Sequence, residues 1–236
     1  MRGKKVIKKR PEICLSLSCG TMEEFERELA QYKNYCQSVE WCVDSMEEEK
    51  GYTRETFLSQ LRHVKALCAG KKLVVDHKGP QEQSNKIQRW AVGVADIIDI
   101  DYNNSQITQL IREAKRKKTK VQISYHCFEG MMSRDAIAEQ YLRMEKLGGD
   151  ILKIACMAKE EIDTHVILEA AAAYSQLRKA KPIIAIAMGE AGQTSRICAG
   201  DFGSVTTYAC GTNTTAPGQF NARELSKYLD IYYEEK

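Results

Sequence analysis

A lysine inside an apolar run is the residue of this sequence best placed for covalent chemistry. Lys153 lies in the run ILKIA at residues 151–155, and strand alternation places it on the opposite face from its two neighbours. Because burial disfavours an ammonium, the pattern predicts a lowered pKa for Lys153. A neutral amine in a dry pocket is the nucleophile that Schiff-base chemistry on a ketone requires. The alternative is a structural lysine paired with an inward acid such as Asp101 or Glu40.

A histidine ends the β-rich run one repeat earlier in the chain. His126 follows the segment QISY at residues 122–125. Neighbouring strands lie about 5 Å apart, so its imidazole could reach a molecule bound to Lys153. Histidine is the usual proton shuttle near neutral pH, and a histidine hydrogen-bonded within a loop is the competing interpretation. His63 and His165 fall on expected surface helices and receive little functional weight.

Two carboxylates, Glu40 and Asp44, alternate with apolar residues along another short run. The spacing predicts that both face the same side, with Cys42 between them. Acids in such positions need partners. They either bind substrate hydroxyls or neutralise inward Lys153 and Lys78.

Two glycine-rich segments, residues 189–196 and 211–219, follow the last two β-rich runs. Such turns and helix N-termini expose backbone N–H donors that bind anions. Arg196 would add a bidentate fork for a carboxylate or phosphate, and Thr215 and Gln219 would add neutral hydrogen bonds. No group of cysteines and histidines has metal-ligand spacing, so no metal is expected.

The elements that must position these residues follow a repeating pattern. A short β-rich run, a loop and an amphipathic helix recur eight times, which fits either a closed α/β barrel or an open doubly wound sheet. No Gly-x-Gly-x-x-Gly opens the first helix, so we predict a single (β/α)8 TIM-barrel domain over residues 1–236, with its active site at the carboxyl ends of the strands. The expected strands are 13–17, 39–43, 73–76, 97–101, 121–125, 151–155, 183–187 and 204–208.

Helix-end signals support the same division of the chain. Thr21 with Glu24 predicts a capping box, and Ser105 is an expected N-cap. Gly148 is expected to end the fifth helix. Apolar residues at positions 162, 166, 170, 173 and 177 predict the buried face of the sixth helix.

Composition restricts the class of protein. Hydrophobic residues make up 43% and charged residues 28% of the 236 residues, and no apolar run approaches the roughly 20 residues of a membrane span. The basic start lacks the apolar core of a secretory signal. Nine scattered cysteines without a CxxC pair favour a reducing cytoplasm. The net charge is +3, and the basic clusters at 4–10 and 115–120 lack interleaved aromatics, which argues against nucleic-acid binding.

Taken together, these segments resemble the motif set of type I 3-dehydroquinate dehydratases. The resemblance is carried by KIACM at 153–157, SYHCF at 124–128, Ser195-Arg196 and APGQ at 216–219, in matching order over nearly the whole chain. It implies a TIM barrel, usually a homodimer, that converts the small molecule 3-dehydroquinate to 3-dehydroshikimate and water in the shikimate pathway without a cofactor.

The resemblance also implies roles for individual residues. Lys153 would form the Schiff base, His126 would remove and return protons, and Glu82 would orient His126. Glu40 would bind ring hydroxyls. The carboxylate end of the substrate would contact the three residues of the glycine-rich segments, Arg196, Thr215 and Gln219.

Two positions depart from the family pattern. Cys42 and Lys78 stand where the family has arginines, and the loop that holds Glu82 continues with Gln83 and Ser84 in place of glycines. The Schiff-base residues are retained while recognition of the ring hydroxyls is altered. A Schiff-base lyase acting on a different carboxylated keto compound, and a catalytically silent barrel that binds a metabolite, are therefore the alternative hypotheses.

Overall fold

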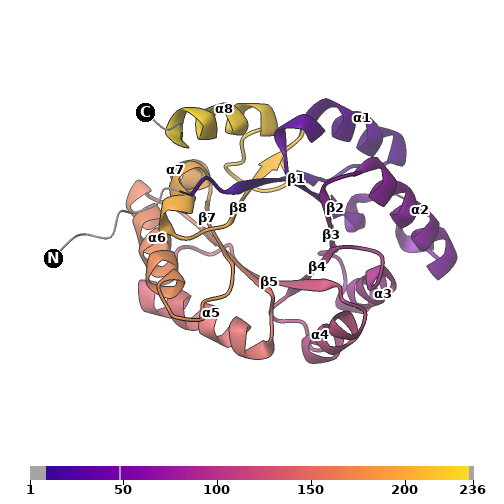
Figure 1. The fold of residues 1–236 in the computed structure, drawn as a ribbon, viewed down its shortest axis with the longest axis horizontal. Helices are drawn as coiled ribbons and strands as arrows, with labels where there is room; N and C mark the ends of the chain where they lie inside the picture. Colours follow the sequence, from indigo (N-terminus) through magenta and orange to yellow (C-terminus); the bar gives the residue numbers. More distant parts are fainter. Residues whose placement is uncertain (1–8, 48, 234–236) are drawn as a thin grey trace.

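The computed structural model describes residues 9–47 and 49–233, so most of the basic cluster at 4–10 lies outside the described residues. Eight parallel strands surround a central axis and the helices lie outside them (Figure 1). The strands are hydrogen-bonded in the order β7-β6-β5-β4-β3-β2-β1-β8. Val205 N donates to Ile183 O at 2.8 Å and brings the two ends of this order together. The predicted TIM barrel is confirmed.

The strands and helices alternate along the whole described chain. The strands are β1 Glu12–Leu17, β2 Ser38–Cys42, β3 Lys72–Asp76, β4 Ile97–Asp101, β5 Lys120–Cys127, β6 Ile151–Met157, β7 Ile183–Met188 and β8 Thr206–Cys210. The α-helices are α1 Met22–Tyr32, α2 Arg54–Leu67, α3 Gln81–Ala91, α4 Ile107–Arg116, α5 Arg134–Leu147, α6 Glu161–Ser175, α7 Gln193–Cys198 and α8 Ala222–Tyr233. None of the described helices is both long and apolar enough to cross a membrane.

The register of β5 and β6 places the two predicted catalytic residues on one face. Ser124 pairs with Lys153, and His126 pairs with Ala155. Residues two apart on a strand point the same way. His126 therefore lies on the inner face, one inward position nearer the carboxyl end than Lys153. It lies within β5, which is longer than expected.

Two helix ends agree at least in part with the sequence signals, and one expected N-cap was wrong. Thr21 accepts from Glu24 N as expected, although the carboxylate of Glu24 accepts from Gly20 N and not from Thr21 N, so only half of the predicted capping box forms. Gly148 adopts φ 102° at the end of α5. Ser105 is not the N-cap of α4, because Gln106 occupies that position and Ser105 instead donates its hydroxyl to Gln81.

The predicted buried face of α6 was also wrong in part. Ile162 is 61% exposed and Leu177, beyond the helix end, is 48% exposed. The side chains that α6 buries include Ile167, Ala171 and Tyr174. Apolar residues surround most of this helix, so periodicity alone admitted more than one face.

An aromatic cluster fixes β2 against the outer helices. Trp41 is fully buried, stacks on Phe57 of α2 at 5.8 Å and meets Phe25 of α1 edge-on at 6.2 Å. Because Trp41 points outward, its neighbours Glu40 and Cys42 point inward. The packing of this cluster thus sets the orientation of Glu40 and Cys42 on β2.

We predict that Trp41→Ala lowers the free energy of unfolding by about 3–5 kcal/mol, because it leaves a large cavity between two helices and the sheet. Equilibrium urea unfolding measures the change. Ile231→Ala is the matched control, since Ile231 is 75% exposed and its truncation should change stability by no more than about 0.5 kcal/mol. Equal effects of the two substitutions would contradict the role assigned to Trp41.

Candidate active site

A cavity of about 240 Å³ opens at the carboxyl ends of the strands. Most of the residues singled out from the sequence line it, from elements far apart in the chain. The lining includes Glu40, Lys78, His126, Lys153, Arg196, Thr215 and Gln219. The barrel thus brings seven of the eight predicted site residues to one cavity.

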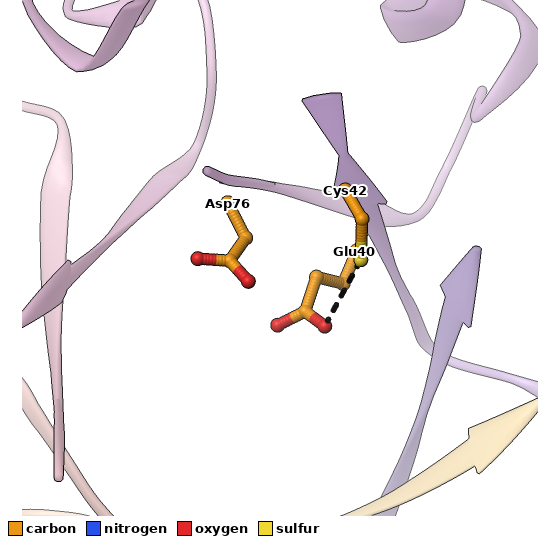
Figure 2. A group of neighbouring side chains, drawn as sticks. All are labelled: Glu40, Cys42 and Asp76. Carbon is orange, nitrogen blue, oxygen red and sulfur yellow. Dashed lines mark hydrogen bonds between the residues drawn. The ribbon is translucent and has the colours of Figure 1, made fainter. Parts of the chain in front are cut away.

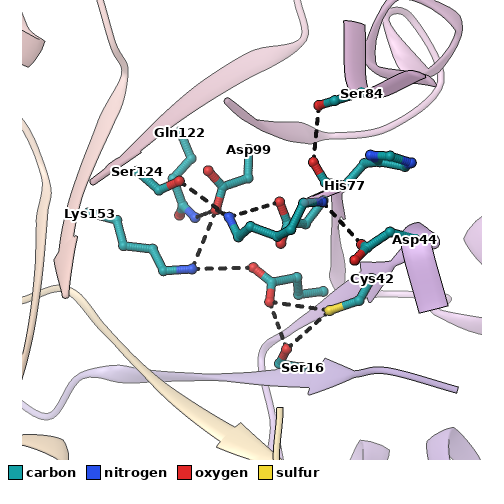
Figure 3. A network of polar contacts seen from close by, with 12 residues as sticks. Ser16, Cys42, Asp44, His77, Ser84, Asp99, Gln122, Ser124 and Lys153 are labelled. Atoms are coloured by element: carbon teal, nitrogen blue, oxygen red, sulfur yellow. Dashed lines mark hydrogen bonds and ion pairs between the residues drawn. The ribbon is translucent and has the colours of Figure 1, made fainter. Parts of the chain in front are cut away.

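Lys153 lies in a layer of four side chains contributed by the even-numbered strands. Its Nζ is 3.6 Å from Glu40 Oε1 of β2, 3.4 Å from Asp99 Oδ2 of β4 and 4.1 Å from the centre of the Tyr208 ring of β8. Figure 3 shows Lys153 extended toward Asp99. Layers built from alternate strands are the usual filling of such barrels. The expected partner Asp101 is not part of this layer, whereas Glu40 is.

The predicted lowering of the Lys153 pKa was wrong. Burial does lower it, but Glu40 and Asp99 raise it by more, so the pKa of Lys153 is raised overall. Two carboxylates within 4 Å stabilise the ammonium by more than desolvation destabilises it. The free protein therefore holds Lys153 as an ammonium, which must lose a proton before it can act as a nucleophile.

His126, in contrast to Lys153, is uncharged. Burial, together with the ammonium groups of Lys78 and Lys153, lowers its pKa to about 2 against the raising effect of Asp99. The imidazole is therefore neutral at neutral pH, the form in which a ring nitrogen can act as a base. It stacks over Phe128 with the ring centres 6.0 Å apart.

Three buried carboxylates surround the two ammonium groups. Burial would raise the pKa of Asp99, but Lys78 and Lys153 lower it below its usual range, and Gln122 Nε2 donates to its Oδ2 at 2.8 Å. Burial, with Asp99 and Glu40, raises the pKa of Asp76 to about 7, against the lowering effect of Lys78. Asp99 therefore carries its charge throughout the neutral range, whereas Asp76 titrates within it.

Asp99 and Asp76 were not found by sequence reasoning. Asp99 has the same strand parity as Asp101, and a search for partners in the even-strand layer would have identified it. Asp76 stands at the end of β3, two residues before Lys78, so strand alternation from Lys78 could have identified it.

Arg196 is a buried cation without a carboxylate partner among the described residues. It is 1% exposed, and it donates only to Tyr208 O at 3.2 Å and Pro217 O at 2.9 Å. Its Nε has no hydrogen-bond partner, and burial lowers its pKa to about 10. A buried, unpaired guanidinium that lines a cavity is well suited to bind an anion.

The loop after β8 is tied to the barrel at this end of the cavity. Gln219 Oε1 accepts from the Thr215 hydroxyl at 3.0 Å, and this hydroxyl also contacts Ser16 Oγ at 3.0 Å. Gly218, with φ +74°, packs so closely that a Cβ there would lie 2.2 Å from Gly189 O. Since Gly189 N also donates to Pro217 O, the loops after β7 and β8 form one packed unit.

Glu82 is the one predicted site residue that the structure does not bring to the cavity. It lies in the exposed first turn of α3 and is not among the residues that line the cavity. The loop before α3 is instead fixed by buried His77, which contacts Glu49 at 2.9 Å and receives a hydrogen bond from Gly79 N.

Glu40, Cys42 and Asp76 place three potential metal-ligand atoms within 4.8 Å of one another (Figure 2). The sequence did not suggest this group, because its members come from two strands. Lys153 lies 3.6 Å from Glu40, and Lys78 lies 3.1 Å from Asp76. These ammonium groups already balance the carboxylates and would repel a divalent cation, so we assign no metal to the group.

Comparison with known proteins agrees with this geometry. The sequence profile of the type I 3-dehydroquinase family matches residues 13–236. The chain belongs to this family. It is 27% identical to the 3-dehydroquinate dehydratase of Clostridioides difficile, over 95% of this chain and 93% of that protein. It is 29% identical to that of Listeria welshimeri, over 95% and 94%.

The fold matches a solved member of the same family. The crystal structure of type I 3-dehydroquinate dehydratase from Clostridium difficile with covalently modified comenic acid superposes with a TM-score of 0.88 and 26% identity, over 97% of this chain and 95% of that one. The resemblance inferred from the motifs is confirmed. Cys42 and Lys78, where the motif resemblance leads us to expect arginines, both line the cavity.

We predict that Glu40→Gln lowers the pKa of Lys153, because it removes one of the two carboxylates that raise it. The pH dependence of Lys153 labelling by an amine-reactive ester, followed by mass spectrometry, measures the change, and the labelling midpoint should move to lower pH. Asp44→Asn is the control, since Asp44 lines the rim but lies outside the Lys153 layer. A midpoint that stays in place in a folded Glu40→Gln protein would refute the assigned ion pair.

Proposed function

We propose that this chain is a 3-dehydroquinate dehydratase that forms a Schiff base through Lys153. The observation that carries the proposal is the arrangement of one cavity, with an amine and a neutral imidazole on neighbouring strands and an unpaired buried guanidinium as a third group. A carboxylated keto ring satisfies all three. Its carboxylate would neutralise Arg196, and its ketone would meet Lys153.

The proposed reaction begins with a proton transfer from Lys153. Glu40 Oε1 lies 3.6 Å from Nζ and is the proposed acceptor, because Lys78 and Lys153 keep the pKa of Asp99 below its usual range and so keep Asp99 ionised. The neutral amine then attacks the ketone carbon, and loss of water gives a protonated imine. This imine is an electron sink, so the neighbouring C–H becomes acidic without a cofactor.

His126 performs the proton transfers that follow. As a neutral base it takes the proton from C2, and the C–H electrons move toward the imine nitrogen to form an enamine. Their return expels the C1 hydroxyl, which leaves as water with the proton from the imidazolium. Hydrolysis of the resulting conjugated imine releases 3-dehydroshikimate and frees Lys153. Glu82, exposed on α3, is proposed to act on His126 only after movement of the loop before α3.

The assembly and location of the protein are part of the same proposal. Family resemblance supports a homodimer, and light scattering after size-exclusion chromatography tests it. A cytoplasmic enzyme of the shikimate pathway agrees with the burial of eight of the nine cysteines as free thiols.

We predict that borohydride traps a covalent adduct at Lys153 when 3-dehydroquinate is present, because the imine is reduced to a stable secondary amine. Peptide mapping by mass spectrometry locates the adduct, and the absorbance of the conjugated enone product reports turnover. Lys153→Arg keeps the positive charge but cannot form an imine, so it should show neither signal. Turnover without an adduct, or an adduct at another lysine, would refute the assigned nucleophile.

We predict that His126→Ala reduces kcat by roughly 10²–10⁴, the usual contribution of a positioned acid–base group, with a much smaller effect on KM. Steady-state kinetics measure both constants. His165→Ala is the matched control, because His165 is exposed on α6 and should be replaceable without loss. A His126→Ala enzyme with a normal kcat would exclude His126 from proton transfer.

A further inference from the structure

The ammonium group of Lys78 is already engaged by polar groups inside the barrel. Its Nζ lies 3.1 Å from Asp76 Oδ1, 3.5 Å from Ser124 Oγ and 4.0 Å from Asp99 Oδ2. The contact with Asp76 is an ion pair, the contact with Ser124 is a hydrogen bond from Nζ, and the contact with Asp99 is a longer-range attraction between charges. Lys78 therefore lines the cavity as a charge that is attracted toward the carboxylates of the barrel wall.

Asp76 is the closest of these partners and the one that fixes the lysine. Lys78 is 38% exposed along its side chain, so packing alone does not hold its end in place. Asp76 is 3% exposed, stands two residues earlier on β3 and cannot move away from the barrel interior. Glu40 and Asp99 lie on the strands on either side of it.

We propose that Asp76 is a positioning residue that determines substrate specificity by holding Lys78 away from the bound substrate. The proposal rests on the proposed dehydratase function and gives a physical cause for the altered recognition of ring hydroxyls expected at Cys42 and Lys78. Glu40, Cys42, Asp76 and Lys78 line this side of the cavity. Because Asp76 pairs with Lys78 and position 42 carries a thiol, this side offers hydrogen-bond acceptors in Glu40, Asp76 and Cys42, and its cation, Lys78, is already in an ion pair. This side selects rings whose substituents donate hydrogen bonds to carboxylates, and it binds less tightly those that need a guanidinium or ammonium donor.

The ion pair has a distinct pH signature. Asp76 titrates near pH 7, so it is ionised and holds Lys78 above that pH, and it releases Lys78 as the pH falls below it. The other titratable and charged groups that face this pair from the surrounding elements are Glu40, Cys42, Asp44, Asp99, His126, Lys153 and Tyr208. Asp76 therefore changes its ionisation between pH 6 and 8, whereas Asp99, whose pKa is lowered by Lys78 and Lys153, does not.

The test is a kinetic double-mutant cycle with 3-dehydroquinate. Asp76→Asn should lower KM on the order of tenfold at pH 8, because it frees one charge-assisted donor of Lys78 for a ring hydroxyl. The gain should be much smaller at pH 6, where wild-type Asp76 is protonated. Adding Lys78→Met, which keeps the length of the side chain without its charge, should abolish the gain. Asp76→Ser provides a second neutral side chain if Asp76→Asn fails to fold.

Two controls separate this proposal from the proposed function. Asp101→Asn changes a carboxylate at the end of β4 that does not line the cavity, and it should leave KM unchanged. Labelling of Lys78 by an amine-reactive ester needs no substrate and should be faster in Asp76→Asn than in the wild type. Faster labelling with no turnover in any variant would support the ion pair and reject the dehydratase function.

The opposite outcomes would overturn the proposal. A folded Asp76→Asn or Asp76→Ser enzyme with unchanged or higher KM, or a gain that survives Lys78→Met, would show that Asp76 does not act through Lys78. Unchanged labelling of Lys78 would remove the ion pair itself.

Discussion

Lys153 is a cation on the axis of a barrel, where only 5% of the residue is exposed. Such a charge is tolerated only when other groups replace the water around it. Glu40, Asp99 and the face of Tyr208 do so from three other even-numbered strands. The acids on β2 and β4 therefore cannot be explained separately from the lysine on β6. Burial and the ammonium groups of Lys78 and Lys153 keep His126 neutral against the opposite effect of Asp99, so the charge of Lys153 affects both the amine and the base.

This balance of charges depends on the packing between the outward side chains of the strands and the surrounding helices. Outward side chains such as Trp41 and Leu152 are fully buried against the helices, and each fixes which neighbours point inward. Shifting a strand by one residue would turn its inward acid toward the helices. The precision of the polar interior is thus supplied by apolar contacts on the other face of the same strands.

The sequence was sufficient to place Lys153 and His126, because strand parity and the order of βα units determine which side chains share a face. It was not sufficient for the sign of the Lys153 pKa shift. That sign depends on which acids reach the same depth along the axis, and depth is set by the stagger of the strands, which parity does not reveal. Asp101 was expected where Asp99 is found for this reason. Glu82 was assigned through the family resemblance alone, and the structure places it in an exposed turn.

The contact between Gly218 and Gly189 has a consequence for redesign of this enzyme. The backbone of the loop after β8 packs directly on the loop after β7, because a Cβ at Gly218 would lie 2.2 Å from Gly189 O, and Gly189 N donates to Pro217 O. Replacing the end of the cavity near Arg196 and Thr215 by the corresponding segments of a homologue would therefore have to transfer both loops together, whereas Cys42 at the end of β2 and Lys78 just after β3 can each be exchanged by a single substitution. The two sides of the cavity mouth thus differ in the size of the unit that must be replaced, a single cavity-lining side chain on one side and a pair of loops on the other.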